Sequence, residues 1–158
     1  MERSEVTAFV GMGANLGDAA QTLQDALTVL SGVPGVRTLK ASSFYRTVPV
    51  DADGPDYVNA VAEIATTLGA PALLAVLQSI EQDFGRQRPY RNAPRTLDLD
   101  LLLYGDARMD SPALTLPHPR MGARAFVLIP LAELWPEGVS PAQRDAVRDQ
   151  PVTRLPRH

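Results

Sequence analysis

Two aspartates stand two positions apart in the run RNAPRTLDLDLLLYGD, residues 91–106, which is otherwise rich in leucine. In a β-strand successive side chains point to opposite faces, so Asp98 and Asp100 would share one face and the neighbouring leucines the other. Two carboxylates on one face repel each other unless a cation lies between them. Mg²⁺ suits such a pair, because it usually binds one or two carboxylates and fills its other positions with water and phosphate oxygens.

Arginine is concentrated beside this pair. Of the fifteen Lys and Arg residues only Lys40 is lysine, and codon bias accounts for the scattered arginines. It does not account for a cluster around the aspartates, which consists of Arg86, Arg88, Arg91 and Arg95 before them and Arg120 and Arg124 after them. Guanidinium groups bind phosphate oxygens through paired hydrogen bonds. The pattern indicates a metal–nucleotide site, although solvated acidic strands, polymerase palms and cyclases also carry paired aspartates.

The hydrophobic pattern predicts the elements that must position these residues. Strands are predicted at 6–13, 36–47, 57–67 and 96–105, and helices at 19–31 and 70–85. Asp18 is expected to cap the first helix, and Pro71 suits the first turn of the second. The order strand, helix, strand, strand, helix, strand predicts an α+β, ferredoxin-like βαββαβ sheet with helices on one face.

The C-terminal part is expected to add to this sheet. Residues 123–135, ARAFVLIPLAELW, predict an additional helix that breaks or restarts near Pro130. From Pro136 the chain is rich in proline and charge, which predicts a loosely held tail. We expect a single domain over 1–158, with its core at about 5–136 and a C-terminal extension at 137–158.

The glycines of GMGANLG, residues 11–17, follow a predicted strand and precede a helix. Their spacing is G-x-G-x-x-x-G, which differs from the dinucleotide-binding G-x-G-x-x-G, and the Gly-Lys-Ser/Thr of a phosphate-binding loop is absent. We therefore interpret the segment as a tight strand-to-helix turn that forms one wall of a pocket.

Composition excludes several classes of function. The 158 residues include no cysteine, and His118 and His158 are the two histidines, which excludes disulfides, thiolate chemistry and multi-histidine metal sites. A net charge of −3 argues against a nucleic-acid binder. No apolar stretch approaches the ~20 residues of a membrane span. The segment MERSEVTAFV lacks a signal-peptide pattern, so we expect a cytoplasmic protein.

Several segments in the same order resemble one family. These are VGMGANLGD, SSFYRTVPV, PDYVNAV, IEQDFGRQR, NAPRTLDLDLLLYG and LPHPRMGARAFVLIPLAEL. Together they closely resemble 6-hydroxymethyl-7,8-dihydropterin pyrophosphokinase, a folate-pathway enzyme, over most of the chain up to about Pro136. The resemblance implies a ferredoxin-like fold. It also implies transfer of the terminal diphosphate of ATP to the hydroxymethyl group of the dihydropterin, with release of AMP.

The resemblance also implies roles for individual positions. Asp98 and Asp100 match the pair that binds two Mg²⁺ ions and, with Arg86 and Arg95, the catalytic set. The positions that match ATP contacts are Glu81, Arg88, Thr115, His118 and Arg124. The positions that match the pterin pocket are Thr47, Val48, Val50, Tyr57, Asn59 and Phe126. The family further favours a monomer.

The residue types fit a pterin independently of the family. A pterin is a flat heteroaromatic ring, which two aromatic side chains can sandwich while an amide such as Asn59 pairs with its edge. One departure from the family concerns Asn92, because many members have a tryptophan there and a segment one residue longer. We expect altered loop closure rather than lost activity, with Tyr90 as the candidate substitute for the aromatic lid.

Two other functions fit the paired aspartates. A nucleotidyltransferase would attack the α-phosphorus and release pyrophosphate, whereas a ligand-sensing ferredoxin-like module would bind without chemistry. For the transfer reaction itself, Asp100 and water are both candidates to accept the hydroxyl proton.

Overall fold

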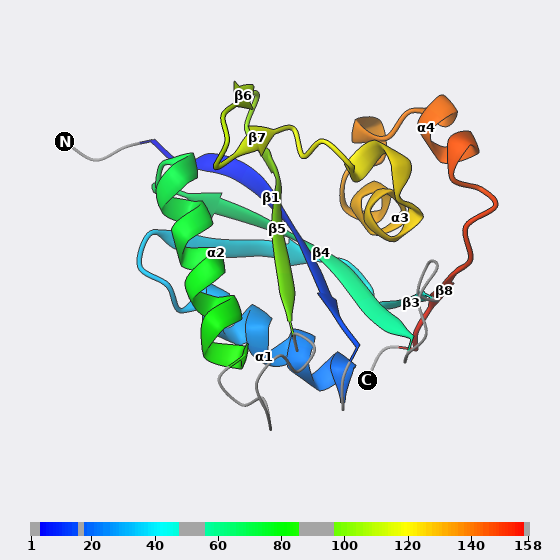
Figure 1. Ribbon diagram of the computed structural model, residues 1–158, viewed down its shortest axis with the longest axis horizontal. Coiled ribbons are helices and arrows are strands. Elements are labelled where there is room, and N and C mark those ends of the chain that lie inside the picture. Colours follow the sequence, from blue (N-terminus) through cyan, green and yellow to red (C-terminus); the bar gives the residue numbers. More distant parts are fainter. Residues whose placement is uncertain (1–3, 16–17, 48–55, 86–96, 157–158) are drawn as a thin grey trace.

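The computed structural model describes residues 4–15, 18–47, 56–85 and 97–156, and the elements named below lie in these ranges. The strands of the main sheet are β1 (Val6–Ala14), β2 (Val36–Ala41), β3 (Tyr45–Thr47), β4 (Tyr57–Thr66), β5 (Asp98–Tyr104) and β8 (Val152–Arg154). The strand order is β5-β1-β4-β3-β8, with β2 also paired to β4, and each of these pairings is antiparallel. This order confirms the predicted ferredoxin-like sheet (Figure 1).

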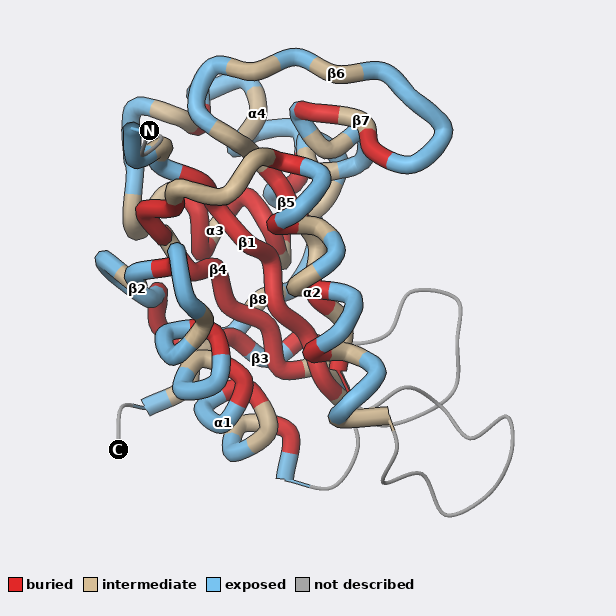
Figure 2. Tube along the Cα trace, turned by 90° about the vertical axis from the view of Figure 1, so that its left-hand side faces the viewer, coloured by how far each residue is buried: buried red, intermediate tan, exposed pale blue. Residues whose placement is uncertain are grey.

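Two helices cover one face of the sheet. They are α1 (Ala19–Ser31), whose first turn is capped by the Asp18 side chain, and α2 (Ala70–Gly85), and both match the predicted ranges. Their buried leucines and alanines pack on the side chains of β1, β4 and β5 that point to the same face. Figure 2 shows the resulting continuous run of buried residues through the sheet.

The opposite face is covered at one end by α3 (Ala125–Leu134). Leu128 and Leu131 of α3 are fully buried against Phe9, Val61 and Leu102, one residue from each of three neighbouring strands. Such burial stabilises the layer by about 25 cal/mol for each Å² of apolar surface removed from water. The rest of this face is left uncovered by α3, and that uncovered part becomes the floor of the site described below.

The helix α3 runs through Pro130, so the predicted break there is wrong. Proline lacks an N–H and removes the hydrogen bond to the carbonyl four residues earlier. In α3 the burial of Val127, Leu128 and Leu131 holds the helix together across the missing bond.

The predicted single strand at 36–47 is wrong, because the chain forms two strands, β2 and β3, separated at 42–44. Side chains replace the strand ladder at the break. The Ser42 hydroxyl accepts a hydrogen bond from the Val61 N–H (2.9 Å), and the Ser43 N–H donates to the Glu133 carboxylate of α3 (2.9 Å). The break therefore depends on a residue 90 positions away, which a local pattern does not reveal.

The prediction of a loosely held tail is also wrong for the described residues after Pro136. After the 3₁₀ turn η2 (Pro136–Gly138) come α4 (Pro141–Ala146) and β8, and Val139 and Val147 are buried. A capping box between Ser140 and Gln143 begins α4, a local signal that the proline-rich composition obscured. The segment then returns to the sheet, where β8 pairs with β3.

The remaining elements connect β5 to α3. They are a small hairpin of β6 (Met109–Asp110) and β7 (Thr115–Leu116), followed by the 3₁₀ turn η1 (Met121–Ala123). Across the described ranges, no helix combines the length and the apolar character needed to cross a membrane.

Candidate active site

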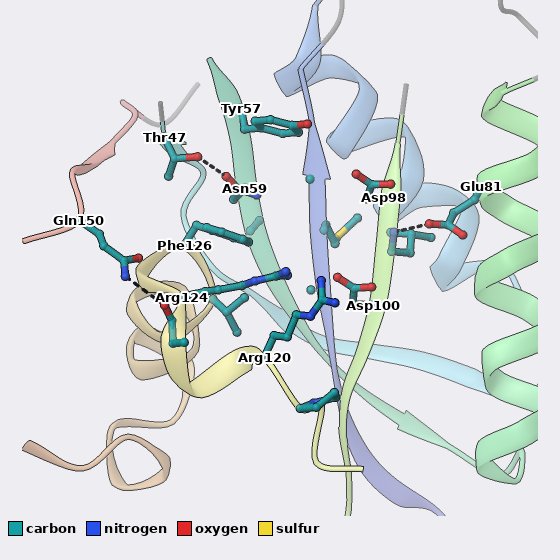
Figure 3. Close-up of a pocket in the computed structure, with 18 of the residues that line it drawn as sticks. Thr47, Tyr57, Asn59, Glu81, Asp98, Asp100, Arg120, Arg124, Phe126 and Gln150 are labelled. Atoms are coloured by element: carbon teal, nitrogen blue, oxygen red, sulfur yellow. Dashed lines mark hydrogen bonds between the residues drawn. The ribbon is translucent and has the colours of Figure 1, made fainter. Parts of the chain in front are cut away.

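A cavity of about 950 Å³ opens on the α3 face of the sheet. The strands β5, β1 and β4 form its floor, with α2 on one side and the η1–α3 segment on the other (Figure 3). The residues predicted for the site that line this cavity are Thr47, Tyr57, Asn59, Glu81, Asp98, Asp100, Arg124 and Phe126. Residues from both predicted substrate pockets thus lie around one space.

Two glycines of β1 keep the floor open. Gly13 is paired with Asn59 on one side and Asp98 on the other, and Gly11 likewise lies between Val61 and Asp100. A Cβ atom on Gly13 would lie 2.9 Å from the Asn59 side-chain nitrogen, closer than the two atoms can approach. Gly11 and Gly13 line the cavity, as predicted. They lie in β1, inside the strand predicted at 6–13, so the interpretation of 11–17 as a turn is wrong for these two residues.

Asp98 and Asp100 project into the cavity from β5, whereas Leu97, Leu99 and Leu101 are buried on the opposite side. The predicted alternation is therefore confirmed. The backbone N–H of Leu99, between the two aspartates, donates to the Glu81 carboxylate of α2 (2.8 Å). This bond fixes the strand segment that carries the carboxylate pair.

The carboxylate pair has the chemistry of a magnesium site. Among the described residues, no three His, Cys, Asp or Glu side chains gather into a candidate metal cluster. Mg²⁺ needs no more than one or two carboxylates when water and phosphate supply the remaining oxygens. Asp100 is about half exposed (47%), which leaves room for those other ligands.

His118 lies beside Asp100, with its Nε2 atom 4.0 Å from a carboxylate oxygen. Its Nδ1 atom accepts the Arg120 N–H (3.2 Å), and its own backbone N–H donates to the Leu102 carbonyl (2.9 Å). Burial lowers the pKa of His118, and the charges of Arg124 and Arg120 add to that effect, against the opposing effect of Asp100. The lowered pKa favours the neutral form of His118 at pH 7.

A second, smaller cavity of about 230 Å³ adjoins the first. Thr115 and His118, both predicted as ATP contacts, line it together with Asp100. Because Asp100 borders both spaces, a ligand held at the carboxylate pair could extend into the smaller one.

Two arginines approach the carboxylates from the other wall. Arg120 and Arg124 come from the η1–α3 segment, and Figure 3 shows their guanidinium groups extending toward the strand that carries Asp100. The Arg124 guanidinium lies over the ring of Phe126, 5.3 Å from its centroid. That contact favours a cation on the aromatic face and holds the two side chains together.

The far end of the cavity combines aromatic rings and an amide. The Thr47 hydroxyl donates to the Asn59 side-chain oxygen (2.8 Å), and both residues are buried. With its oxygen held by Thr47, Asn59 presents its NH₂ group toward Gly13 and the cavity. Tyr57 and Phe126 line the same end (Figure 3). The arrangement suits a flat heteroaromatic ligand whose edge carries hydrogen-bonding groups.

Five predicted site residues lie outside the described ranges: Arg86, Arg88, Arg95, Val48 and Val50. The departure at Asn92 and its substitute Tyr90 also lie outside them.

Some cavity residues were not predicted. Gln78 lies one helical turn before Glu81 on α2, so helix periodicity could have added it to the site. Gln150 also lines the cavity, but the sequence carried no signal for it, because β8 brings it there by pairing with a strand a hundred residues earlier.

A ferredoxin-like sheet that presents two carboxylates, two guanidinium groups and an amide–aromatic wall to one cavity fits an enzyme of the phosphate-transferring class. Comparisons with known proteins agree with this class and identify the family. The family model described as 7,8-dihydro-6-hydroxymethylpterin-pyrophosphokinase (HPPK) matches residues 9–136. The chain belongs to this family of pyrophosphokinases, as its motifs predicted.

Relatives and solved structures support this assignment. The 2-amino-4-hydroxy-6-hydroxymethyldihydropteridine pyrophosphokinase of Synechocystis sp. is 45% identical over 134 residues, which cover 85% of this chain and 69% of that protein. The enzyme of the same name from Pseudomonas aeruginosa is 45% identical over 130 residues, 82% of this chain and 80% of that one. A crystal structure of an HPPK-DHPS in complex with substrates has the same fold, with a TM-score of 0.69 at 12% identity. The alignment covers 85% of this chain but only 40% of the longer HPPK-DHPS chain.

Proposed function

We propose that this chain transfers the β,γ-diphosphate of ATP to the hydroxymethyl group of 6-hydroxymethyl-7,8-dihydropterin. The observation that carries the proposal is that one cavity joins the carboxylate pair to the amide–aromatic end. The hydroxymethyl oxygen would attack the β-phosphorus, the bond from that phosphorus to the oxygen bridging to the α-phosphorus would break, and AMP would leave with the bridging oxygen.

Asp98 and Asp100 are the residues that would hold magnesium, and we propose two ions, as in the family. Bound there, magnesium would neutralise phosphate charge and orient the two substrates. The half-exposed Asp100 carboxylate and the neighbouring second cavity support an ATP phosphate chain at this end.

The cationic side chains would bind the rest of the phosphate charge. Arg124 approaches the carboxylate pair across the cavity, and Arg86, Arg88 and Arg95 are proposed to join it on the basis of the sequence motifs. Glu81, Thr115 and His118 would complete the ATP site. A neutral His118 suits this position, because it offers a hydrogen bond near the phosphates. It carries no positive charge that would compete with magnesium for the Asp100 carboxylate.

The pterin would occupy the other end of the cavity. Its ring would lie between Tyr57 and Phe126, with its edge hydrogen-bonded to Asn59, whose orientation Thr47 fixes. Val48 and Val50 are proposed to line the same pocket. Placing the pterin hydroxymethyl group beside the ATP phosphates converts a bimolecular reaction into one between two oriented groups.

Product identification tests this function. The chain is incubated with ATP, Mg²⁺ and the hydroxymethyl-dihydropterin, and both products are analysed by mass spectrometry. We expect AMP and the pterin diphosphate in equal amounts. Release of pyrophosphate would instead favour a nucleotidyltransferase, and ligand binding by calorimetry without turnover would favour a sensing module.

We further propose that the chain acts as a cytoplasmic monomer on these small molecules, with no nucleic-acid substrate, and that residues 1–158 form one pyrophosphokinase domain. Its net charge of −3 supports the exclusion of nucleic acid.

A further inference from the structure

The side-chain amide of Gln150 bridges the two peptide groups on either side of Arg124. Its oxygen accepts a hydrogen bond from the Ala125 N–H (2.9 Å), and its nitrogen donates to the Ala123 carbonyl (3.0 Å). Ala125 is the first residue of α3, whose first N–H groups have no partner within the helix. Within the described residues, the Arg124 side chain does not cap them, so Gln150 supplies one cap from 25 positions away.

Gln150 is itself fixed from both directions along the chain. Its backbone N–H donates to the carbonyl of Val147 (3.0 Å), which is buried. Two residues further on, Val152 begins β8 and pairs with Thr47 of β3. The amide of Gln150 therefore extends from a short segment anchored at both ends, and Figure 3 shows it reaching the turn before α3.

We propose that Gln150 is a positioning residue that sets the place of Arg124 in the cavity. This inference rests on the proposed function, in which Arg124 contacts ATP. A guanidinium binds phosphate through directed hydrogen bonds, so a displacement of its backbone by a fraction of an ångström misaligns them. Gln150 lies beyond the residues 9–136 that match the family, so the family match does not assign this role.

A purely structural role fits Gln150 less well. The residue is exposed, and hydrogen bonds near solvent contribute little to folding stability. The segment is already anchored by the buried Val147 and by the pairing of β8 with β3. Loss of the amide should therefore affect the placement of Arg124 more than the stability of the fold.

The test compares Gln150→Met with a matched control. Methionine keeps the length of the side chain and removes both hydrogen bonds. Gln143→Met removes a side-chain-to-backbone bond of the same kind, in the α4 capping box of the same segment and outside the cavity. We expect Gln150→Met to lower kcat/KM for ATP about tenfold, whereas Gln143→Met should stay within about twofold of the wild type.

A double-mutant cycle with Arg124→Ala separates positioning from general destabilisation. If Gln150 acts through Arg124, the effect of Gln150→Met should fall below about twofold once Arg124 is alanine. An unchanged tenfold effect in that background would overturn the inference, as would a Gln150→Met variant as active as the wild type. A wild-type chain that releases no AMP would overturn the proposed function itself and this role with it.

Discussion

At the scale of single residues, the site depends on which side chains of three strands are large, small or charged. The alternation on β5 sends leucines into the core and Asp98 and Asp100 into the cavity. The missing side chains of Gly11 and Gly13 leave the space between the carboxylates and Asn59 open. Each of these choices can be tested by one substitution.

Replacing either aspartate by asparagine should remove most of the turnover while leaving the fold intact. The change preserves shape but removes a charged oxygen ligand. The charge stabilisation that a metal supplies is worth several kcal/mol, which corresponds to at least about 100-fold in rate. The measurement is AMP formation by Asp98→Asn and Asp100→Asn. Thermal unfolding serves as the control, and the midpoint of Asp100→Asn should not fall, because one of two like charges has been removed. Rates like those of the wild type would exclude the metal role.

Gly13→Ala should weaken pterin binding selectively. The new methyl group would collide with the Asn59 amide, which would then rotate away and lose its hydrogen bond from Thr47. A lost hydrogen bond and a displaced ring edge should raise the dissociation constant for the pterin about tenfold. Titration with the pterin and, separately, with an ATP analogue measures this. Equal weakening of both ligands would show that the variant is damaged in general and not at the pterin pocket.

At the scale of elements, α3 is attached to the sheet through the break between β2 and β3. The Glu133 carboxylate accepts hydrogen bonds from the Ser43 N–H, the Ser43 hydroxyl and the Tyr45 hydroxyl (2.9, 3.1 and 2.5 Å). Burial, together with the bond to Glu133, raises the pKa of Tyr45 to about 12. Burial alone would raise the pKa of Glu133, but the bonds from Tyr45 and Ser43 outweigh it and lower that pKa.

Glu133→Gln should therefore destabilise the fold by about 1–2 kcal/mol at pH 7, because charge-assisted bonds become neutral ones. A carboxyl whose pKa is lower in the folded state contributes stability above its unfolded pKa, near 4.5. That contribution disappears as the pH falls through the folded value. The difference between wild type and variant in urea unfolding should thus shrink toward pH 3. A difference that stays constant with pH would contradict a charged role for Glu133.

At the scale of the whole molecule, the C-terminal segment after α3 packs against the rest of the fold. Its residues Val139 and Val147 are part of the core between α3 and the sheet, and its strand β8 pairs with β3. Its residue Gln150 touches the turn before α3, while β8 pairs with Thr47, so one segment contacts both the Arg124 wall and the pterin end.

Val147→Ala tests whether this segment belongs to the core. Val147 is 2% exposed, so removing two methyl groups should cost about 2 kcal/mol of unfolding free energy. The matched control is Val29→Ala on α1, where the valine is 45% exposed and alanine is the better helix former. Chemical denaturation of both variants should show a loss for Val147 alone. Equal stability of the two variants would mean that the segment is only loosely attached.

The local parts of this architecture could be predicted from sequence, and the long-range parts could not. The Asp98–Asp100 alternation and the helix capped by Asp18 depend on neighbours a few residues away. The division of 36–47 depends on Glu133, and the place of Gln150 depends on β8. Composition was misleading after Pro136, because two buried valines and a capping box hold an otherwise polar segment in place.

The most direct measurement is a crystal structure of the chain with Mg²⁺ and a non-hydrolysable ATP analogue. We predict metal density against the Asp98 and Asp100 carboxylates, with the phosphate chain between that metal and Arg124. A nucleotide bound elsewhere, with both carboxylates free of metal, would contradict the account.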